Sequence, residues 1–100
     1  MKKLLHAVNH CHTLNICHRD LKPANILLSC PGGDADVKIV DFGVAKHSST
    51  PMTEFIGTPY YLAPEVFSGI YGKECDIWSL GVMLHFMLVL RHPFTGKNLQ

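Results

Sequence analysis

The chain has 100 residues, of which 47% are apolar and 17% charged, and its formal net charge is +1. This length suits one small domain, and the near-neutral charge excludes the basic surface that is typical of nucleic-acid binding. The apolar stretch over 77–90 is shorter than the ~20 residues that a membrane-spanning helix needs, so we expect no membrane span. The four cysteines form no CxxC pair, and although residues 1–5 mimic the start of a secretory leader, the apolar run breaks at His6. We therefore expect reduced thiols in an intracellular, cytoplasmic protein.

The first half of the chain is predicted to contain one helix and one hairpin. Residues 2–15 carry apolar side chains at helical spacing, which predicts an amphipathic helix with His12 mostly on its polar side. A polar loop follows over 16–23. The short apolar runs 26–28 and 37–40 flank a Gly- and Pro-containing turn, and this pattern predicts two strands of a hairpin.

The second half has one long predicted helix. Residues 44–62 are rich in Ser, Thr, Pro and Gly and show no clear period, and 64–67 is expected to form one helical turn. Residues 73–90 predict a helix that is apolar nearly all round and should be buried on most sides, with Trp78 in the core. Pro93 follows its end.

Three short motifs occur in order along the chain. They are HRDLKPAN at 18–25, DFG at 41–43 directly after the second predicted strand, and APE at 63–65. Each is a weak signal alone, but the ordered set resembles the signature of eukaryotic protein kinases. The resemblance continues through DIWSLGV at 76–82 and covers essentially the whole chain. It is most similar to the calcium/calmodulin-dependent and calcium-dependent kinase group.

This resemblance implies an α+β, protein-kinase-like fold. Residues 1–100 are expected to form part of the C-lobe, with a helix, the catalytic loop, a short β-hairpin, the activation segment and a buried central helix. The Gly-rich loop, strand lysine and partner glutamate of the N-lobe have no match in the sequence, and we expect them and the last C-lobe helices to lie outside it. The isolated chain is therefore expected to be inactive and to expose apolar surface.

The resemblance also implies ATP-dependent phosphorylation of protein hydroxyls, with ATP and Mg²⁺ as cofactors. Asp20 is the expected catalytic base, and Lys22 is expected beside the transferring phosphate. Asn25 and Asp41 are the expected Mg²⁺ ligands, since a hard cation prefers oxygen donors. Lys22 at this loop position, together with Thr58 in the substrate site, favours Ser and Thr acceptors in protein substrates.

Other residues are expected to hold or regulate this site. By resemblance, His18 and Glu65 have structural roles, and Asp76 braces the backbone of the catalytic loop from the central helix. The same Asp76 can also be interpreted simply as an acid at a helix N-terminus.

Arg19 and Lys46 resemble members of a basic pocket that an activation-loop phosphate neutralises. Glu54 stands four residues before Thr58, where the phosphorylated residue commonly lies. Our hypothesis is that Glu54 supplies a permanent negative charge there, the alternative being a solvated loop residue. Other residues that could be phosphorylated are Ser48, Ser49, Thr50 and Thr53.

Two other functions stay open at this point. One is a non-catalytic, kinase-like binding or decoy module, although the expected catalytic residues are all present. The other is a metal-binding protein, because His6 and His10 lie one helical turn apart and could form a zinc pair. No HExxH motif and no finger-like spacing of Cys and His completes such a site.

Overall fold

The computed structural model describes residues 1–94 of the chain. The helices are α1 (Lys2–Thr13), α2 (Pro64–Ser68) and α3 (Glu74–Val89), with short 3-10 turns η1 (Pro23–Asn25) and η2 (Pro59–Tyr61). The strands are β1 (Ile16–Cys17), β2 (Ile26–Leu28), β3 (Val37–Ile39) and β4 (Lys46–His47). They pair as two small antiparallel sheets, β1 with β4 and β2 with β3. The mixture of helices and small sheets confirms the predicted α+β class.

Helix α1 forms because its apolar residues recur at helical spacing, and Leu4 and Val8 are buried against the rest of the fold. The helix ends at Thr13, two residues earlier than predicted, because Asn15 adopts a left-handed conformation with φ 57°. His12 is buried, so its expected position on the polar side of the helix is wrong.

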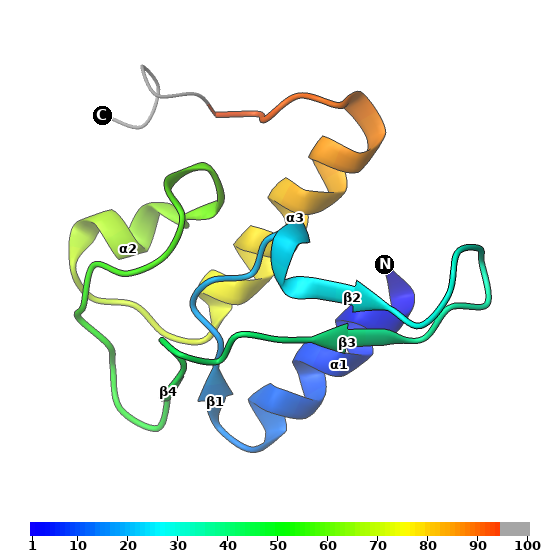
Figure 1. Cartoon of the computed structure of the whole chain (residues 1–100). Helices are drawn as coiled ribbons and strands as arrows, with labels where there is room; N and C mark the ends of the chain where they lie inside the picture. The colour runs from blue at the N-terminus through cyan, green and yellow to red at the C-terminus, as the bar shows by residue number, and fades with distance from the viewer. Residues whose placement is uncertain (95–100) are drawn as a thin grey trace.

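The predicted hairpin is confirmed. β2 and β3 pair in register, with Ile26 opposite Ile39 and Leu28 opposite Val37. The hairpin packs against α1 (Figure 1), and the Lys3 ammonium donates to the carbonyl of Ala35, 2.7 Å away, at the end of its connecting turn. The hairpin and the first helix therefore form one packed unit.

The pairing of β1 with β4 was not predicted. β4 lies in the segment without a clear period, and Ile16 faces His47 while Cys17 faces Lys46. This ladder is only two residues long on each strand, which is too short to leave a period in the sequence.

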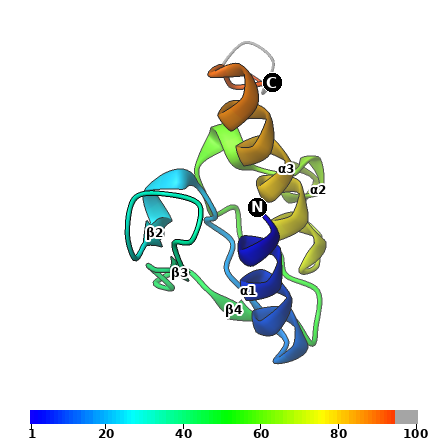
Figure 2. The same ribbon diagram turned by 90° about the vertical axis from the view of Figure 1, so that its right-hand side faces the viewer.

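Helix α3 carries the core of the molecule in its N-terminal half. Leu80 is buried in one cluster with residues of α1, and Cys75 is buried in a second cluster with residues of β1 and α2. Trp78 is partly buried and packs against both clusters. Figure 2 shows α1 beside this half of α3.

The C-terminal half of α3 is exposed on much of its surface. It projects beyond the rest of the fold in both views (Figures 1 and 2), and Leu88 is 75% exposed. Val82 and Met83 are buried, but the predicted burial of this helix on most sides is wrong for 84–89, because no other helix or strand of residues 1–94 covers that surface. The same surface agrees with the expectation that these residues expose apolar area. No helix within residues 1–94 is long and apolar enough to cross a membrane.

Candidate active site

Asp76, in the first turn of α3, holds the start of the 18–25 loop. Its side chain is 1% exposed, and its two carboxylate oxygens accept hydrogen bonds from the backbone amides of His18 at 2.9 Å and Arg19 at 3.0 Å. The ring of His12 donates a third hydrogen bond from Nε2 at 3.0 Å. Burial alone raises the pKa of Asp76, but these three donors outweigh it and hold the pKa below its ordinary value. The carboxylate is therefore a charged, fully engaged brace between α3 and the loop.

His12 is the member of this network that the sequence analysis missed. The signal was nevertheless present, since His12 follows Leu4 and Val8 at intervals of four residues and so lies on their buried side of α1. A polar residue on a buried helical stripe requires a partner, and the partner here is Asp76.

His18 links the 18–25 loop to the segment that follows β3. Its Nε2 donates to the carbonyl of Val40 at 2.9 Å, and its Nδ1 accepts from the backbone amide of Asp20 at 3.1 Å. One neutral tautomer, with the proton on Nε2, satisfies both bonds. The ring also meets Phe42 edge to face, with centroids 4.7 Å apart. His18 thus contacts the backbone of the 18–25 loop and of the segment after β3.

Two residues of the site have left-handed backbone conformations, Arg19 with φ 73° and Asp41 with φ 60°. Residues with a Cβ adopt this region at a cost of roughly 1–3 kcal/mol each. The amide of Arg19 is fixed by Asp76, and the carbonyl before Asp41 is fixed by His18. The hydrogen bonds of the buried histidine and aspartate therefore hold the two strained positions.

Asp20, Lys22 and Thr58 form a connected group of polar side chains. The Thr58 hydroxyl donates to Oδ1 of Asp20 at 2.7 Å, and the Lys22 ammonium donates to that hydroxyl oxygen at 3.0 Å. The ammonium also lies 4.0 Å from Oδ2 of Asp20. Residues 20 and 58 are brought together at Gly57, which has φ 123°, and a Cβ there would lie only 2.8 Å from the carbonyl oxygen of Arg19.

Asn25 and Asp41 also approach one another through the backbone. The Val40 amide donates to the carbonyl of Asn25 at 2.9 Å, and the side-chain amide of Asn25 donates to the carbonyl of Asp20 at 2.8 Å. This bond uses the nitrogen of the Asn25 side chain, and within residues 1–94 no hydrogen bond reaches its side-chain oxygen. Asp41 is exposed, and its Oδ1 accepts a long bond of 3.4 Å from Gly43. One amide oxygen and one carboxylate are donors that fit Mg²⁺.

Arg19, Lys46 and Glu54 form a second charged group. Oε1 of Glu54 lies 3.2 Å from Nη1 of Arg19, and Oε2 lies 2.8 Å from Nζ of Lys46. The hydrogen bond from Lys46, followed by backbone donors, lowers the pKa of Glu54 to about 2. The Tyr71 hydroxyl donates to the carbonyl of Glu54 at 2.6 Å and accepts from Arg19 at 3.2 Å. Sequence reasoning anticipated the three charges but not Tyr71, which links them to the segment before α3.

The remaining candidates lie apart from this centre. Glu65 is half-buried in the first turn of α2, and its carboxylate has no ion-pair partner among residues 1–94. His6 and His10 are exposed on α1, and neither belongs to a cluster of three potential metal ligands in the described part of the chain. The zinc hypothesis therefore receives no support at this pair.

Comparisons with known proteins give the family of the chain. A family model described as protein kinase domain matches residues 1–100. Calcium-dependent protein kinase 5 of Plasmodium berghei (strain Anka) is 45% identical over 98% of this chain and 18% of its own length. Calcium-dependent protein kinase 4 of Plasmodium falciparum (isolate 3D7) is 46% identical over 98% of this chain and 19% of its own. Calcium-dependent protein kinase 27 of Arabidopsis thaliana is 42% identical over 97% of this chain and 20% of its own length. The chain thus spans a minor part of the length of these relatives, and by the family match it belongs to the protein kinase domain family.

Proposed function

We propose that this chain is the part of a Ser/Thr protein kinase C-lobe that orients the acceptor hydroxyl and binds magnesium. The observation that carries the proposal is the hydrogen bond of 2.7 Å between the Thr58 hydroxyl and Asp20, with Lys22 bound to the same hydroxyl. A carboxylate that already accepts from a hydroxyl has the chemistry needed to orient a Ser or Thr substrate and take its proton.

Each polar residue of the group has a distinct part in the proposed reaction. Asp20 holds the acceptor hydroxyl and receives its proton as the oxygen attacks. The ammonium of Lys22, 4.0 Å from Oδ2 of Asp20, offsets the negative charge of the transferring phosphate. Asn25 and Asp41 would hold Mg²⁺ through side-chain oxygens. When bound, ATP supplies the phosphoryl group and Mg²⁺ neutralises its charge.

Ser and Thr specificity and an intracellular location belong to this proposal. Specificity rests on Lys22 and Thr58, and the names of the relatives, which are calcium-dependent protein kinases, agree with protein phosphorylation. The location rests on the spacing of the four cysteines, which is irregular and contains no CxxC pair.

The test is phosphoryl transfer by a chimera in which the N-lobe and remaining C-lobe of Plasmodium berghei calcium-dependent protein kinase 5 complete this chain. We expect transfer from labelled ATP to a Ser peptide and its Thr counterpart, and none to the Tyr counterpart. Asp20→Asn should lower the rate by about 10²–10⁴-fold, because the proton acceptor is lost. Asp36→Asn, at an exposed residue of the hairpin, is the matched control.

Two results would contradict the proposal. One is an Asp20→Asn rate close to that of the unaltered chimera. The other is a folded chimera that binds ATP but transfers nothing, which would favour the non-catalytic binding module.

We also propose that Glu54 replaces a regulatory phosphate in the pocket of Arg19 and Lys46. Its carboxylate contacts both cations, at 3.2 Å and 2.8 Å, so the pocket is neutralised without modification. The phosphatase-treated chimera should therefore keep its activity, and Glu54→Ala should reduce it. Full activity of Glu54→Ala, or loss of activity after phosphatase treatment, would show that Glu54 is not the switch.

A further inference from the structure

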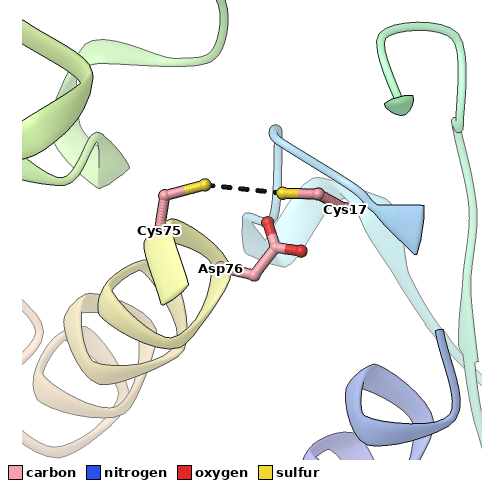
Figure 3. A group of neighbouring side chains, drawn as sticks. All are labelled: Cys17, Cys75 and Asp76. Atoms are coloured by element: carbon pink, nitrogen blue, oxygen red, sulfur yellow. Dashed lines mark hydrogen bonds between the residues drawn. The ribbon is translucent and has the colours of Figure 1, made fainter. Parts of the chain in front are cut away.

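Cys17 and Cys75 form a buried pair of thiols that the proposed reaction does not use. Cys17 ends β1, directly before the 18–25 loop, and Cys75 lies in the first turn of α3. Their sulfur atoms are 3.5 Å apart although 58 positions separate them in the sequence, and the two residues are 0% and 4% exposed. Figure 3 shows the sulfurs pointing toward one another, with the carboxylate of Asp76 beside them.

We propose that Cys17 and Cys75 are a redox-active pair that a small peroxide converts to a disulfide, linking β1 covalently to α3. In the first step the Cys75 sulfur attacks one peroxide oxygen, the O–O bond breaks, and a sulfenic acid and one water form. In the second step the Cys17 sulfur attacks the sulfenic sulfur, and the hydroxyl leaves as water with the Cys17 proton. Two thiols are oxidised and one hydrogen peroxide is reduced to two waters.

The distance between the sulfurs favours a disulfide. A disulfide bond is about 2.05 Å long, so the two sulfurs need to approach by roughly 1.5 Å, which small side-chain rotations can supply. No other cysteine of the chain has a sulfur contact of this kind within the described residues, since Cys11 and Cys30 have no hydrogen bond to another sulfur across the fold.

A zinc ion could instead bind between Cys17, Cys75 and Asp76, but the hydrogen bonds of Asp76 disfavour it. Cys17, Cys75 and Asp76 offer ligand atoms within 4.8 Å of one another, so they make up three of the four ligands that structural zinc needs. However, the carboxylate of Asp76 already accepts three hydrogen bonds, including the two backbone amides that it braces. Binding zinc would compete with that brace, whereas a disulfide leaves it intact.

The order of the two steps follows from burial. The hydrogen bond with Cys75, and then burial, raise the pKa of the Cys17 thiol, so it stays protonated and is the poorer nucleophile for the first step. Cys75 is 4% exposed and Cys17 is 0% exposed, so we assign the first attack to the less deeply buried residue, Cys75. Entry requires a local opening, and the two-residue ladder between β1 and β4 is the short, weakly held element that can open.

The disulfide would act in parallel with Asp76. It joins the residue directly before His18 to the residue directly before Asp76, and these two partners are already joined by a hydrogen bond of 2.9 Å. Oxidation therefore adds a covalent link beside the existing hydrogen bond at the start of the loop, and the folded protein should become more stable.

The experiment treats the folded 100-residue chain with hydrogen peroxide and then labels the remaining thiols with N-ethylmaleimide in denaturant. Peptide mass spectrometry should find Cys17 linked to Cys75, with Cys11 labelled. The melting temperature should rise by more than about 5 °C, and dithiothreitol should reverse the rise. Cys75→Ala should abolish the linked peptide and the rise, whereas Cys30→Ser, at an exposed thiol, should keep both.

The alternatives have distinct readouts. A chain oxidised in urea should give mixed pairs, so a Cys17–Cys75 link that forms equally well in urea would overturn a role for the fold. Labelled Cys17 and Cys75 after oxidation of the folded chain would overturn the proposal. Stoichiometric zinc in the reduced protein that protects both thiols from labelling would replace it with a metal site. None of these measurements depends on kinase activity.

Discussion

Replacing Asp76 by Asn tests the brace between α3 and the 18–25 loop. The change keeps the shape of the side chain but replaces one carboxylate oxygen by an NH₂ group. Oδ2 accepts from both His12 and the amide of His18, and Oδ1 accepts from the amide of Arg19. Whichever way the Asn side chain turns, at least one buried N–H then faces another donor.

The magnitude follows from these contacts. Hydrogen bonds to a charged group are worth about 1.5–3 kcal/mol, and a buried donor without an acceptor costs about 1–3 kcal/mol. Asp76 is 1% exposed, so little solvent can compensate. We therefore expect Asp76→Asn to lower the free energy of unfolding by about 3–5 kcal/mol. A chain of this size has a total stability of about 5–15 kcal/mol, so the loss is a large part of it.

Urea unfolding followed by fluorescence measures this loss directly. Trp78 is the single tryptophan of the chain and lies in α3 close to Asp76. Asp36→Asn is the control, because its side chain is 89% exposed and its ion pair with Lys3 is 3.7 Å long. A loss below about 1 kcal/mol for Asp76→Asn, or an equal loss for the control, would refute the reasoning.

The carboxyl group of Asp76 should also make the stability of the folded chain depend on pH. The pKa of Asp76 is lower in the folded protein than its ordinary value of 3.8. Its contribution is therefore fully present above pH 3.8 and is lost as the pH falls through the folded pKa. The stability of the unaltered chain should fall in this acid window, and that of Asp76→Asn should fall less.

Three further predictions concern other parts of the site. Asp41→Ala in the chimera should lower phosphoryl transfer by orders of magnitude and raise the Mg²⁺ concentration needed for half-maximal rate; an unchanged Mg²⁺ titration would remove Asp41 from the metal site. Gly57→Ala should destabilise the chain by roughly 1–3 kcal/mol in urea unfolding, because φ is 123° and the new Cβ would meet the carbonyl of Arg19. An unaltered unfolding midpoint would contradict this close approach. In carbon NMR the Glu54 carboxyl should titrate near pH 2, and Lys46→Met should return it toward its ordinary value of 4.5; a midpoint near 4.5 before the substitution would mean that the contact is absent in solution.

The sequence predicted the elements whose patterns are local. Helix α1, the β2–β3 hairpin and most of α3 follow from apolar spacing and turn residues within short windows. The family resemblance implied that Asp20 and Thr58 belong to one site, and the two side chains lie in direct hydrogen-bond contact. Local patterns were sufficient for these helices and strands because each residue's neighbours in sequence largely decide its conformation.

The features that were missed depend on distant contacts. The burial of His12 is explained by Asp76, which is 64 positions away, and the β1–β4 ladder joins two-residue strands 30 positions apart. The exposure of Leu88 could not be read from α3 itself, because an apolar helix is buried only where other elements cover it. The periodicity of a sequence indicates which side of a helix or strand is apolar, but it does not indicate which other element packs against that side.

The Asp76 brace has a consequence for the order in which the chain acquires its structure. The carboxylate binds amides that lie 57 and 58 positions earlier, so the 18–25 loop is synthesised long before its brace exists. Until α3 docks, the hydrogen bond from the Arg19 amide to Asp76 is missing, and it cannot offset the strained conformation of Arg19. Closing so long a loop costs entropy before the contact is gained, which delays such pairings in folding. The loop should therefore be among the last parts of the site to gain protection from hydrogen exchange during refolding, in step with α3 rather than with its sequence neighbour α1.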